Sequence, residues 1–535
     1  MGVYLNPGNM EFSRAVHSKI YVDKTMLIEH TNDALFTEQQ FISVSRPRRF
    51  GKSMAVNMLA AYYGRGCDSR ELFSGLKISD HPGFEKHLNQ YNVIRINMRN
   101  ALSRGKSVEG MIAILEKMIS LELKRECRDV DFSEIDFMSY LEDAFAQTGI
   151  SFVFIIDEWD CIFRVSKNDS TAQARYLDFL RFLLKDQPYV ALAYMTGILP
   201  VKKYGEHSAL NMFTEITVTN PMEYAEFTGF TEPEVAALSE KYGVSLDETK
   251  RWYDGYDVMG ISIYNPRSVV MVMLSGIFDS YWTQTETYEA LKIYIQMGYD
   301  GLRERVARLI AGENISVNIE KFQNDMTTLA GADDVLTLLI HLGYLTYDFS
   351  KKTCRIPNNE VRREFINCIE TEGYPRMVEA IRSSAELLRQ TFLENEEEVA
   401  LRIEKIHEEN SSILRYNDET SLAYAVELAY YAAQETYALY REMPAGKGFA
   451  DLVYVPDRAC MTPALVIELK WNRTAETALD QIRRHNYAEC LKHYQGEILL
   501  VGISYDRDLR KGGKKHFCKI ERVIKDMPVG SSKTE

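Results

Sequence analysis

Three groups of residues in this chain of 535 residues have the types and spacing that phosphate chemistry requires. Gly51-Lys52-Ser53 follows one apolar run, Asp157-Glu158 ends a second, and Asp451 lies upstream of the pair Glu468 and Lys470. A lysine beside a helix N-terminus attracts phosphate oxygens, whereas neighbouring carboxylates bind divalent cations. The sequence therefore predicts one site for a phosphorylated ligand and a second site for metal-dependent chemistry.

The first group has the strand, loop and helix that a phosphate-binding loop needs. Residues 41–44 read as a short buried strand, and an apolar helical stretch follows at residues 54–63. Helix N-terminal N–H groups would cradle the phosphates, Lys52 would reach the β and γ oxygens, and the Ser53 hydroxyl would bind Mg²⁺. The residues predicted to bind the nucleotide at this loop are Arg49, Phe50, Gly51, Lys52 and Ser53.

The loop departs from the G-x-x-x-x-G-K-[ST] pattern at Arg46, which occupies the position of the first glycine. A residue with a side chain restricts positive φ angles, so this loop is expected to differ in shape from the common one. A plain surface turn is the alternative interpretation of the motif. Arg46, Arg48 and Arg49 crowd the loop, and charge alone does not decide whether they serve the nucleotide or an interface.

Two further strands are predicted to deliver polar side chains to the same site. Residues 151–156 read as a buried parallel strand, so Asp157 would bind the Mg²⁺ ion and Glu158 would activate the attacking water. Thr196 follows the strand predicted at 190–195 and would sense the γ-phosphate. The alternatives are acids that merely end a buried strand and a threonine that merely forms a turn.

The chain resembles a known family at a set of short motifs. They are Tyr21-Val22-Asp23-Lys24-Thr25, the loop from Arg46 to Ser53, Ile155-Ile156-Asp157-Glu158-Trp159-Asp160, Trp252-Tyr253-Asp254-Gly255-Tyr256 and Tyr264-Asn265-Pro266. Together they resemble the bacterial and archaeal AAA-like ATPases that carry a PD-(D/E)xK nuclease-like domain at the C-terminus. The resemblance implies ATP and Mg²⁺ as cofactors, and the family's own loop has arginine at the position of Arg46.

The second half of the chain holds the predicted metal site. Residues 446–455 read as a turn entering a strand, and residues 464–470 read as another strand. Side chains repeat every two residues along a strand, so Glu468 and Lys470 share a face, which Asp451 reaches if the strands pair as a hairpin. The two carboxylates would hold a divalent ion, and Lys470 would steady the nucleophile or the developing charge. A half-exposed strand with charged residues remains the alternative.

The resemblance adds three positions to this site. It implies a role for Gln481 in the helix predicted from residue 478 to residue 487, which precedes a further strand at 497–503. It also implies an additional acid at Glu427, within a helix predicted over 422–440, although a solvated or capping carboxylate is the alternative. Phe449 stands where many relatives have arginine, which puts substrate contacts at that turn in question.

Composition is that of a soluble globular protein, with 46% hydrophobic residues, 26% charged residues and a formal net charge of -14. Eight scattered cysteines form no C-x-x-C pair, which argues against a structural zinc or a disulfide framework. The N-terminus has no signal-peptide pattern and no run approaches membrane-spanning length, so a cytoplasmic protein without a membrane partner is expected.

A basic strip near the end of the chain would contact phosphates, although a solvated surface is the alternative. Its residues are Arg507, Arg510, Lys511, Lys514, Lys515, Lys519, Arg522 and Lys525.

The fold predicted from these landmarks is α/β. A P-loop core with a parallel sheet is expected over residues 1–230, a mainly helical lid or winged-helix-like region over 231–355, a helical connector over 356–410, and an α/β nuclease-like domain over 411–535. Within the second region, residues 252–256 should pack and turn rather than react, and a helix and wing are predicted at 334–347. The charged segment 394–410 reads as a solvated helix.

The function expected is ATP binding, and ATP hydrolysis, coupled to a Mg²⁺-dependent nuclease-like domain that acts on nucleic acid. The sequence does not choose between DNA and RNA, and it leaves a homo-oligomer open. One alternative is a regulatory ATPase switch whose C-terminal domain binds nucleic acid or protein without cutting it. A second is a nucleotide-stabilised scaffold that does not turn ATP over.

Overall fold

The chain folds into two compact units, which are described separately. The first comprises residues 1–294 and 315–363, and the second comprises residues 295–314 and 364–535. The computed structural model describes residues 2–166, 168–201, 210–282, 287–322, 329–371, 375–410, 419–445, 448–456, 462–485, 491, 494, 496–506 and 516–523.

A five-stranded parallel sheet forms the centre of the first unit. Its strand order is β2-β3-β4-β1-β5, so β1 and β3, which are distant in the sequence, lie on either side of β4. The strands predicted at 41–44, 151–156 and 190–195 are confirmed. The bounds are β1 (Phe41–Ser45), β2 (Asn92–Asn97), β3 (Phe152–Asp157), β4 (Val190–Gly197) and β5 (Thr214–Ile216).

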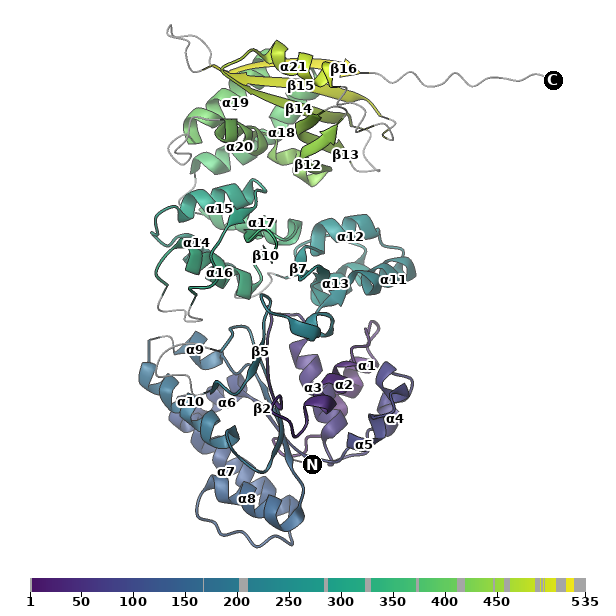
Figure 1. Ribbon diagram of the computed structural model, residues 1–535, viewed down its shortest axis with the longest axis vertical. Helices are drawn as coiled ribbons and strands as arrows, with labels where there is room; N and C mark the ends of the chain where they lie inside the picture. The colour runs from purple at the N-terminus through teal and green to yellow at the C-terminus, as the bar shows by residue number, and fades with distance from the viewer. Residues whose placement is uncertain are drawn as a thin grey trace, which may run out of the picture. The chain divides into compact units, whose positions relative to one another are not determined.

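Helices cover both faces of this sheet, as Figure 1 shows. Alternate residues of β3 enter opposite cores, because Phe154 and Ile156 pack with one helical layer and Val153 and Ile155 with the other. One layer contains α6 (Met98–Gly105), α7 (Val108–Glu126), α8 (Phe137–Thr148), α9 (Cys161–Val165) and α10 (Ser170–Leu184). The other contains α1 (Met10–Val16), α2 (Leu27–Ala34), α3 (Lys52–Tyr63), α4 (Arg70–Phe73), the 3₁₀ helix η1 (Lys77–Asp80) and α5 (Phe84–His87).

The rest of the first unit consists of helices and two small antiparallel sheets. One sheet has the order β6-β8-β7 and the other β10-β11-β9. The helix and hairpin predicted near residue 340 are present as α16 followed by β10 and β11. The bounds are η3 (Met222–Phe227), β6 (Phe230–Thr231), α11 (Glu232–Tyr242), α12 (Leu246–Tyr253), β7 (Tyr256–Val258), β8 (Ile261–Tyr264), α13 (Pro266–Ser275), β9 (Ile315–Ser316), α16 (Ala332–Leu342), β10 (Thr346–Asp348) and β11 (Thr353–Arg355).

The motif at residues 252–256 is a packing element in this region. The Tyr253 hydroxyl donates to the carbonyl of Asp279 at 2.9 Å, and the Tyr256 hydroxyl donates to the carbonyl of Gly343 at 2.9 Å. The Asp254 carbonyl accepts a hydrogen bond from the Asn358 side chain at 2.7 Å. The motif therefore fastens the small β6-β8-β7 sheet to the segments around residues 343 and 358.

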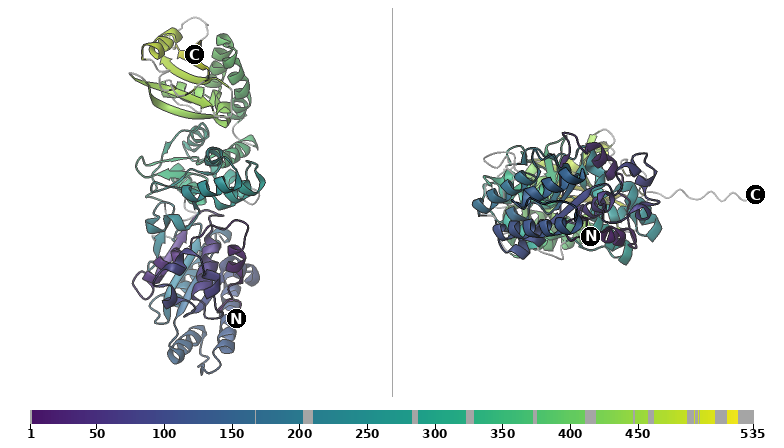
Figure 2. Two further views of the ribbon diagram at one scale, coloured as in Figure 1. Left: turned by 90° about the vertical axis from the view of Figure 1, so that its right-hand side faces the viewer. Right: turned by 90° about the horizontal axis from the view of Figure 1, so that it is seen from below.

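The second unit contains a five-stranded mixed sheet of order β12-β13-β14-β15-β16. Helices α19 and α20 pack on one face of this sheet and α21 on the other (Figure 2). Helices α14 (Thr287–Ile295) and α17 (Asn359–Thr371) carry the chain from the first unit into the second. The remaining bounds are α15 (Leu302–Ile310), α18 (Pro375–Phe392), α19 (Glu396–Asn410), α20 (Glu419–Ala429), η4 (Tyr431–Glu435), β12 (Tyr437–Ala445), β13 (Gly448–Pro456), β14 (Ala464–Trp471), α21 (Ala475–Arg484), β15 (Ile498–Tyr505) and β16 (His516–Val523).

Two predictions for this unit are wrong. The helix expected over 422–440 ends at Ala429, and residues 437–445 instead form β12, because pairing with β13 satisfies their backbone groups in a strand. The helix expected to be solvated at 394–410 has one buried face. Its residues Val399, Ile403 and Ile406 are almost fully buried, and the helix packs against β16.

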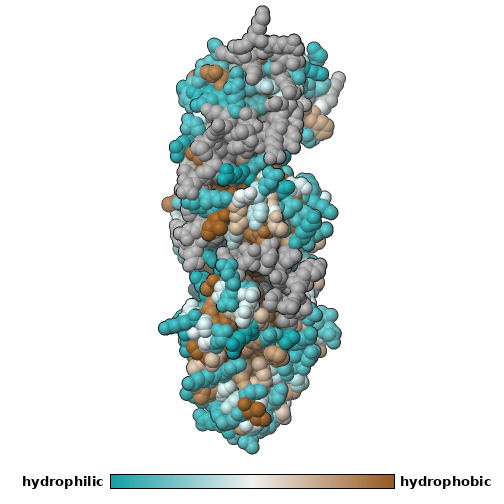
Figure 3. Space-filling model, turned by 90° about the vertical axis from the view of Figure 1, so that its left-hand side faces the viewer, coloured by the Kyte–Doolittle hydropathy of each residue, from teal (hydrophilic) through white to brown (hydrophobic). Residues whose placement is uncertain are grey.

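The surface mixes polar and apolar side chains. Figure 3 shows brown apolar residues in small areas among teal polar ones on one face of the molecule. Within the part of the chain that the structure describes, no helix combines the length and the apolar character needed to cross a membrane.

Substitution of two glycines that end helices can test how tightly the loop at residues 46–51 is packed. Gly243 and Gly343 both have left-handed φ angles, of 68° and 87°. A Cβ atom at Gly243 would meet nothing within 4 Å, whereas one at Gly343 would lie 2.6 Å from Cβ of Pro47. Gly243→Ala should therefore lower the free energy of unfolding by about 1 kcal/mol, and Gly343→Ala by about 2–4 kcal/mol. Urea unfolding measures both, and equal losses would contradict a close Pro47 contact.

Candidate functional site

The carboxylate of Asp157 joins three elements at the carboxyl edge of the parallel sheet. It lies at the end of β3 and is only 3% exposed. Its Oδ2 accepts the Ser53 hydroxyl at 2.8 Å, and its Oδ1 accepts the Thr196 hydroxyl at 2.6 Å. Since β1 and β3 flank β4, the sheet order itself brings these side chains together. A hydroxyl beside a buried carboxylate is an oxygen ligand set of the kind that Mg²⁺ prefers.

Lys52 begins α3 directly after Gly51, whose φ of 86° turns the loop into the helix. The Lys52 ammonium donates to the carbonyls of Arg46 and Pro47, at 2.8 and 2.7 Å. Burial lowers the pKa of Lys52 to about 8, against the opposing effect of nearby Asp157. The loop therefore closes around its own lysine with carbonyl oxygens, which phosphate oxygens would replace as acceptors.

Glu158 is held by an ion pair. Its φ of 54° is left-handed, and its Oε2 lies 3.1 Å from the guanidinium of Arg164. The same arginine lies 3.0 Å from Oδ2 of Asp160, which is fully buried. Glu158 therefore stands next to the Ser53–Asp157 pair with one oxygen already engaged, and a base at this position would act through the other oxygen.

The residues between Arg46 and Gly51 contact the other half of the first unit. Arg49 donates to the carbonyl of Tyr281 at 2.7 Å, and the ring of Phe50 packs edge-on against Tyr256 with 5.0 Å between centroids. Buried Arg46 donates through Nε to the hydroxyl of Thr228 at 3.0 Å. The large side chains at loop positions where small residues are usual thus contact the part of the first unit that follows β5, which is called the second subdomain below.

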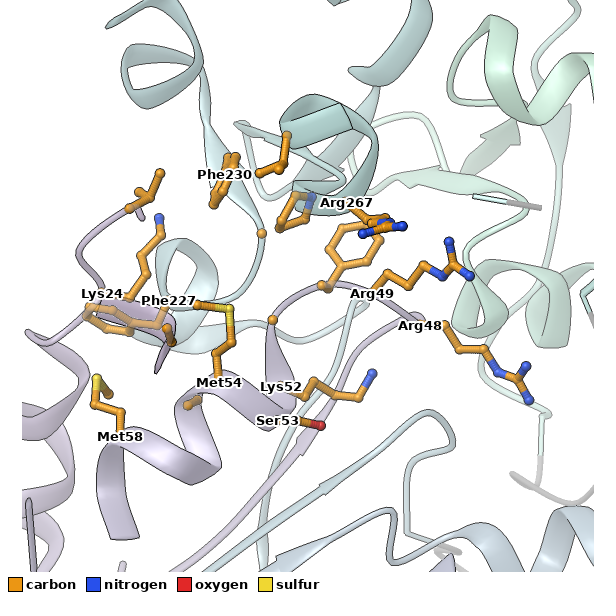
Figure 4. Close-up of a pocket in the computed structure, with 18 of the residues that line it drawn as sticks. Lys24, Arg48, Arg49, Lys52, Ser53, Met54, Met58, Phe227, Phe230 and Arg267 are labelled. Atoms are coloured by element: carbon orange, nitrogen blue, oxygen red, sulfur yellow. The ribbon is translucent and has the colours of Figure 1, made fainter. Parts of the chain in front are cut away.

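A pocket of about 790 Å³ opens beside the loop. Figure 4 shows Lys52 and Ser53 at the start of α3, with Phe227 and Met58 to one side and Arg49 and Arg267 to the other. Most of the residues predicted for the nucleotide site line this pocket, whereas Thr196 does not. Those that line it are Arg49, Phe50, Gly51, Lys52, Ser53, Asp157 and Glu158. An apolar part lies next to the phosphate-binding part, lined by Phe12, Ile20, Val22, Met54, Met58, Phe227 and Phe230.

Lys24 and Arg267 are among the basic residues of the pocket that sequence reasoning missed. Lys24 lies within the motif at residues 21–25, and its ammonium donates to the Glu226 carbonyl at 2.6 Å and to the carboxylate of Glu234. Arg267 follows Asn265 and Pro266, which start α13. The Asn265 side chain accepts the Arg267 backbone N–H at 2.9 Å. This helix cap fixes where α13 begins, and it thereby sets the position of Arg267 in the first turn. The two motifs were visible, but their shared pocket was not.

The second group of residues lies on one face of the sheet in the second unit. Strands β13 and β14 pair antiparallel, with Leu452 opposite Ile467, so the condition under which Asp451 was expected to reach the face of Glu468 and Lys470 is met. The Lys470 ammonium lies 2.7 Å from Oε1 of Glu468, and Oδ2 of Asp451 accepts the backbone N–H of Leu469 at 2.7 Å. Sequence alternation therefore identified the shared face of Glu468 and Lys470 correctly.

Glu468 is a buried acid of this group whose pKa is raised. Burial, followed by the negative charge of Asp451, raises the pKa of its carboxyl to about 7, although Lys470 acts in the opposite direction. Its side chain is 1% exposed, and within the described part of the protein its Oε2 has no hydrogen-bond partner. A buried carboxylate oxygen without a partner, close to a second carboxylate, suits a divalent cation.

The remaining predicted residues of this site have different surroundings. Helix α21 packs against β14 and β15 through Ala478, Leu479 and Ile482, and Gln481 is half-buried on it. Glu427 is neither solvated nor a helix cap, because it is buried and its two oxygens accept from Arg441 at 2.6 and 2.8 Å. Phe449 is 61% exposed on β13.

Only part of the predicted basic strip can be described. Lys519 pairs with Glu396 at 2.8 Å, and Arg522 pairs with Glu394 at 2.6 Å. These two cations therefore bind acids of the same unit. Arg507, Arg510, Lys511, Lys514, Lys515 and Lys525 lie outside the described residues.

Comparison with known proteins identifies both halves of the chain. Residues 8–205 match the family described as predicted AAA-ATPase, and residues 419–514 match the PD-(D/E)XK nuclease superfamily. The chain is thus an AAA-like ATPase-domain protein. It combines this domain with a C-terminal domain that matches the PD-(D/E)XK nuclease superfamily, as its motifs predicted.

Similar individual proteins add little to this identification. An uncharacterized protein from the vnfD 5′ region of Azotobacter chroococcum mcd 1 is 27% identical over 387 residues, which is 69% of each chain. Structures of the Aeropyrum pernix ORC2 protein in its ADPNP-ADP and ADP forms are 10% and 9% identical, with TM-scores of 0.31 and 0.26. Both matches cover 67% of this chain and 98% of the other.

The raised pKa of Glu468 predicts how pH affects the metal-free protein. Between the unfolded-state value near 4.5 and the folded-state value of about 7, only the folded chain holds the proton, so stability falls as pH rises through this window. The expected loss is on the order of 2 kcal/mol, and Glu468→Gln should abolish it. Urea unfolding in EDTA between pH 5 and pH 8 measures the loss. A decline of the same size in the Glu468→Gln variant would assign it to other groups.

Proposed function

We propose that the protein binds ATP with Mg²⁺ and hydrolyses it, and that its nucleotide state controls a Mg²⁺-dependent nuclease that acts on nucleic acid, either DNA or RNA. The ATP would lie in the first unit beside α3. The phosphodiester would be cut beside β14 in the second. The arrangement of Asp451, Glu468 and Lys470 on one sheet face is the observation that carries the proposal.

The pocket of the first unit fits a nucleoside triphosphate. Lys52 and the start of α3 would bind the β and γ phosphates, with Arg49, Phe50 and Gly51 forming the loop around them. Ser53 and Asp157 would hold Mg²⁺, while Thr196, which is hydrogen-bonded to Asp157, would report on the γ-phosphate. Glu158 would take the proton of the attacking water with its oxygen that does not face Arg164.

The sheet face of the second unit fits a divalent cation. Asp451 and Glu468 would hold it, and the cation would supply a Lewis acid for the phosphodiester. Lys470 would hold the nucleophile or the developing negative charge, and Gln481 would orient substrate from α21. Glu468 and Lys470 are buried, so charges at this site interact more strongly than they would in water.

A chain of contacts supports control by the nucleotide. The loop residue Arg49 binds the carbonyl of Tyr281, and the backbone N–H groups of Tyr281 and Trp282 both donate to Oε1 of Glu360, at 2.7 and 2.8 Å. Glu360 is buried near the start of α17, the helix that carries the chain into the second unit. Phosphates that draw Lys52 away from the Arg46 and Pro47 carbonyls would therefore shift a loop tied to α17.

Cleavage of nucleic acid tests the proposal directly. The purified protein is incubated with labelled single- and double-stranded DNA and RNA, with Mg²⁺ or Mn²⁺, and with or without ATP. We expect metal-dependent cleavage that Lys470→Ala and Asp451→Ala reduce by at least about 100-fold, since the metal and charge stabilisation are lost. Lys351→Ala, which changes an exposed lysine, serves as the control.

The nucleotide part has its own outcome in this assay. ATP should change cleavage in the unmodified protein but not in Lys52→Ala. Absence of cleavage under every condition, with ATP still hydrolysed, would support instead a regulatory switch whose C-terminal domain binds without cutting.

A second experiment separates an ATPase from a scaffold that only binds nucleotide. Glu158→Gln keeps the shape of the side chain but removes the base, so hydrolysis should fall by roughly 10²–10⁴-fold while bound ATP is retained. Steady-state phosphate release and filter binding of labelled ATP measure the two effects. The control is Glu240→Gln, an exposed acid on α11. A protein that never releases phosphate, even without the substitution, would favour the scaffold.

A further inference from the structure

Ser504 has a buried hydroxyl with no recorded partner beside the acid and lysine cluster of the second unit. Its side chain is 0% exposed, and its Oγ atom has no hydrogen-bond partner among the residues that the structure describes. Buried hydroxyl groups are ordinarily hydrogen-bonded, so the groups that lie next to this hydroxyl are its candidate partners. Neither the sequence motifs nor the family resemblance pointed to this residue.

The sheet places Ser504 next to Lys470. Strands β14 and β15 pair in parallel, with Lys470 opposite Ser504 and Glu468 opposite Gly502. A Cβ atom on Gly502 would lie 2.5 Å from the Ala475 carbonyl of α21, so this face of β15 is the one that α21 covers. Side chains repeat every two residues, which puts Glu468, Lys470 and Ser504 on that same face.

Asp451 completes a row across three strands. Asp451 lies one residue beyond the last pair of β13 and β14, which is Leu452 with Ile467, and its Oδ2 accepts the backbone N–H of Leu469 at 2.7 Å, next to Glu468. The row therefore runs from Asp451 on β13, through Glu468 and Lys470 on β14, to Ser504 on β15. Its two ends are an acid and a hydroxyl, with the lysine between them.

Among the residues that the structure describes, the Lys470 ammonium has two hydrogen-bond acceptors. It donates to Oε1 of Glu468 at 2.7 Å and to the carbonyl of Leu469 at 3.0 Å, whereas an ammonium has three donors. A divalent cation held by Asp451 and Glu468 would compete with Lys470 for the same carboxylate. The lysine then needs another acceptor that keeps it in the site, and the Ser504 hydroxyl is the neighbour across the strand pair.

We propose that Ser504 is a positioning residue of this site, whose hydroxyl accepts a hydrogen bond from Lys470 when Asp451 and Glu468 hold a divalent cation. The inference rests on the proposed function for the role of the cation in cleavage, but its geometry stands on this sheet alone. Ser504 acts through Lys470 and does not touch the phosphodiester. It keeps the lysine aimed at the reacting group while Glu468 is engaged.

The test compares Ser504→Ala with Ser504→Thr in the full-length protein. Binding of Mn²⁺ is measured by titration calorimetry without nucleotide, and the part of the heat that is lost in Glu468→Gln belongs to this site. Ser504→Ala should weaken this binding roughly 3–10-fold, because the displaced lysine loses its acceptor. Ser504→Thr, which keeps the hydroxyl, should restore most of it.

The matched control removes a similar group elsewhere. Ser239 on α11 is also buried and its Oγ atom also lacks a recorded partner, but it belongs to the first unit. Ser239→Ala should leave Mn²⁺ binding unchanged. Where cleavage is detected, Ser504→Ala should lower kcat about 10-fold with KM for the nucleic acid nearly constant, because the lysine acts on the transition state.

The outcomes separate this inference from the proposed function. Weaker Mn²⁺ binding in Ser504→Ala, restored in Ser504→Thr, would support the role of Ser504 even in a protein that never cuts nucleic acid. Binding and kcat equal to those of the unmodified protein would reduce Ser504 to a small residue that makes room for α21. The inference would be overturned if the wild-type protein bound no Mn²⁺ at this site. If that protein also cut nucleic acid in the absence of Mn²⁺ and Mg²⁺, the metal part of the proposed function would be overturned as well.

Discussion

The parallel sheet of the first unit fixes the position of one carboxylate on which the nucleotide site depends. Asp157 receives hydroxyl groups from Ser53 and Thr196 only because β4 lies between β1 and β3. The strands are buried on both faces, so their register is set by two separate cores and not by the polar residues themselves. The polar site is thus a product of apolar packing, which holds the hydroxyl and carboxylate groups before any ligand arrives.

The loop between β1 and α3 is held by contacts of its large side chains. A loop rich in glycine would be free of its surroundings, whereas here Pro47, Arg49 and Phe50 each lie against residues of the second subdomain. The loop can therefore change shape only together with its neighbours, since packed interfaces switch between discrete arrangements rather than deform gradually. The same side chains that make the motif look irregular in sequence therefore couple the shape of the loop to the position of these neighbours.

Local patterns were sufficient for the strands that carry the predicted site residues, β3, β4, β13 and β14. Asp157, Glu468 and Lys470 follow from short apolar runs and from alternation, which depend on neighbouring residues only. Lys24 and Arg267 could not be assigned in this way, because the folding of distant segments puts them in one pocket. Residues 437–440, the end of the helix predicted over 422–440, were misjudged for a related reason. Pairing with β13 decides their structure, and the sequence pattern of a single segment does not record its partner.

Asp451 has a second task that bears on how such motifs are interpreted. Pairing between β13 and β14 stops at Leu452 and Ile467, and beyond that point the Asp451 side chain takes over by accepting the N–H of Leu469. The acid therefore fastens the separating strands in addition to facing Glu468. A related chain without nuclease activity would still need an oxygen acceptor at the position of residue 451 to close its sheet. An acid at this position in a related chain is consequently explained by the structure of the sheet and does not by itself indicate catalysis.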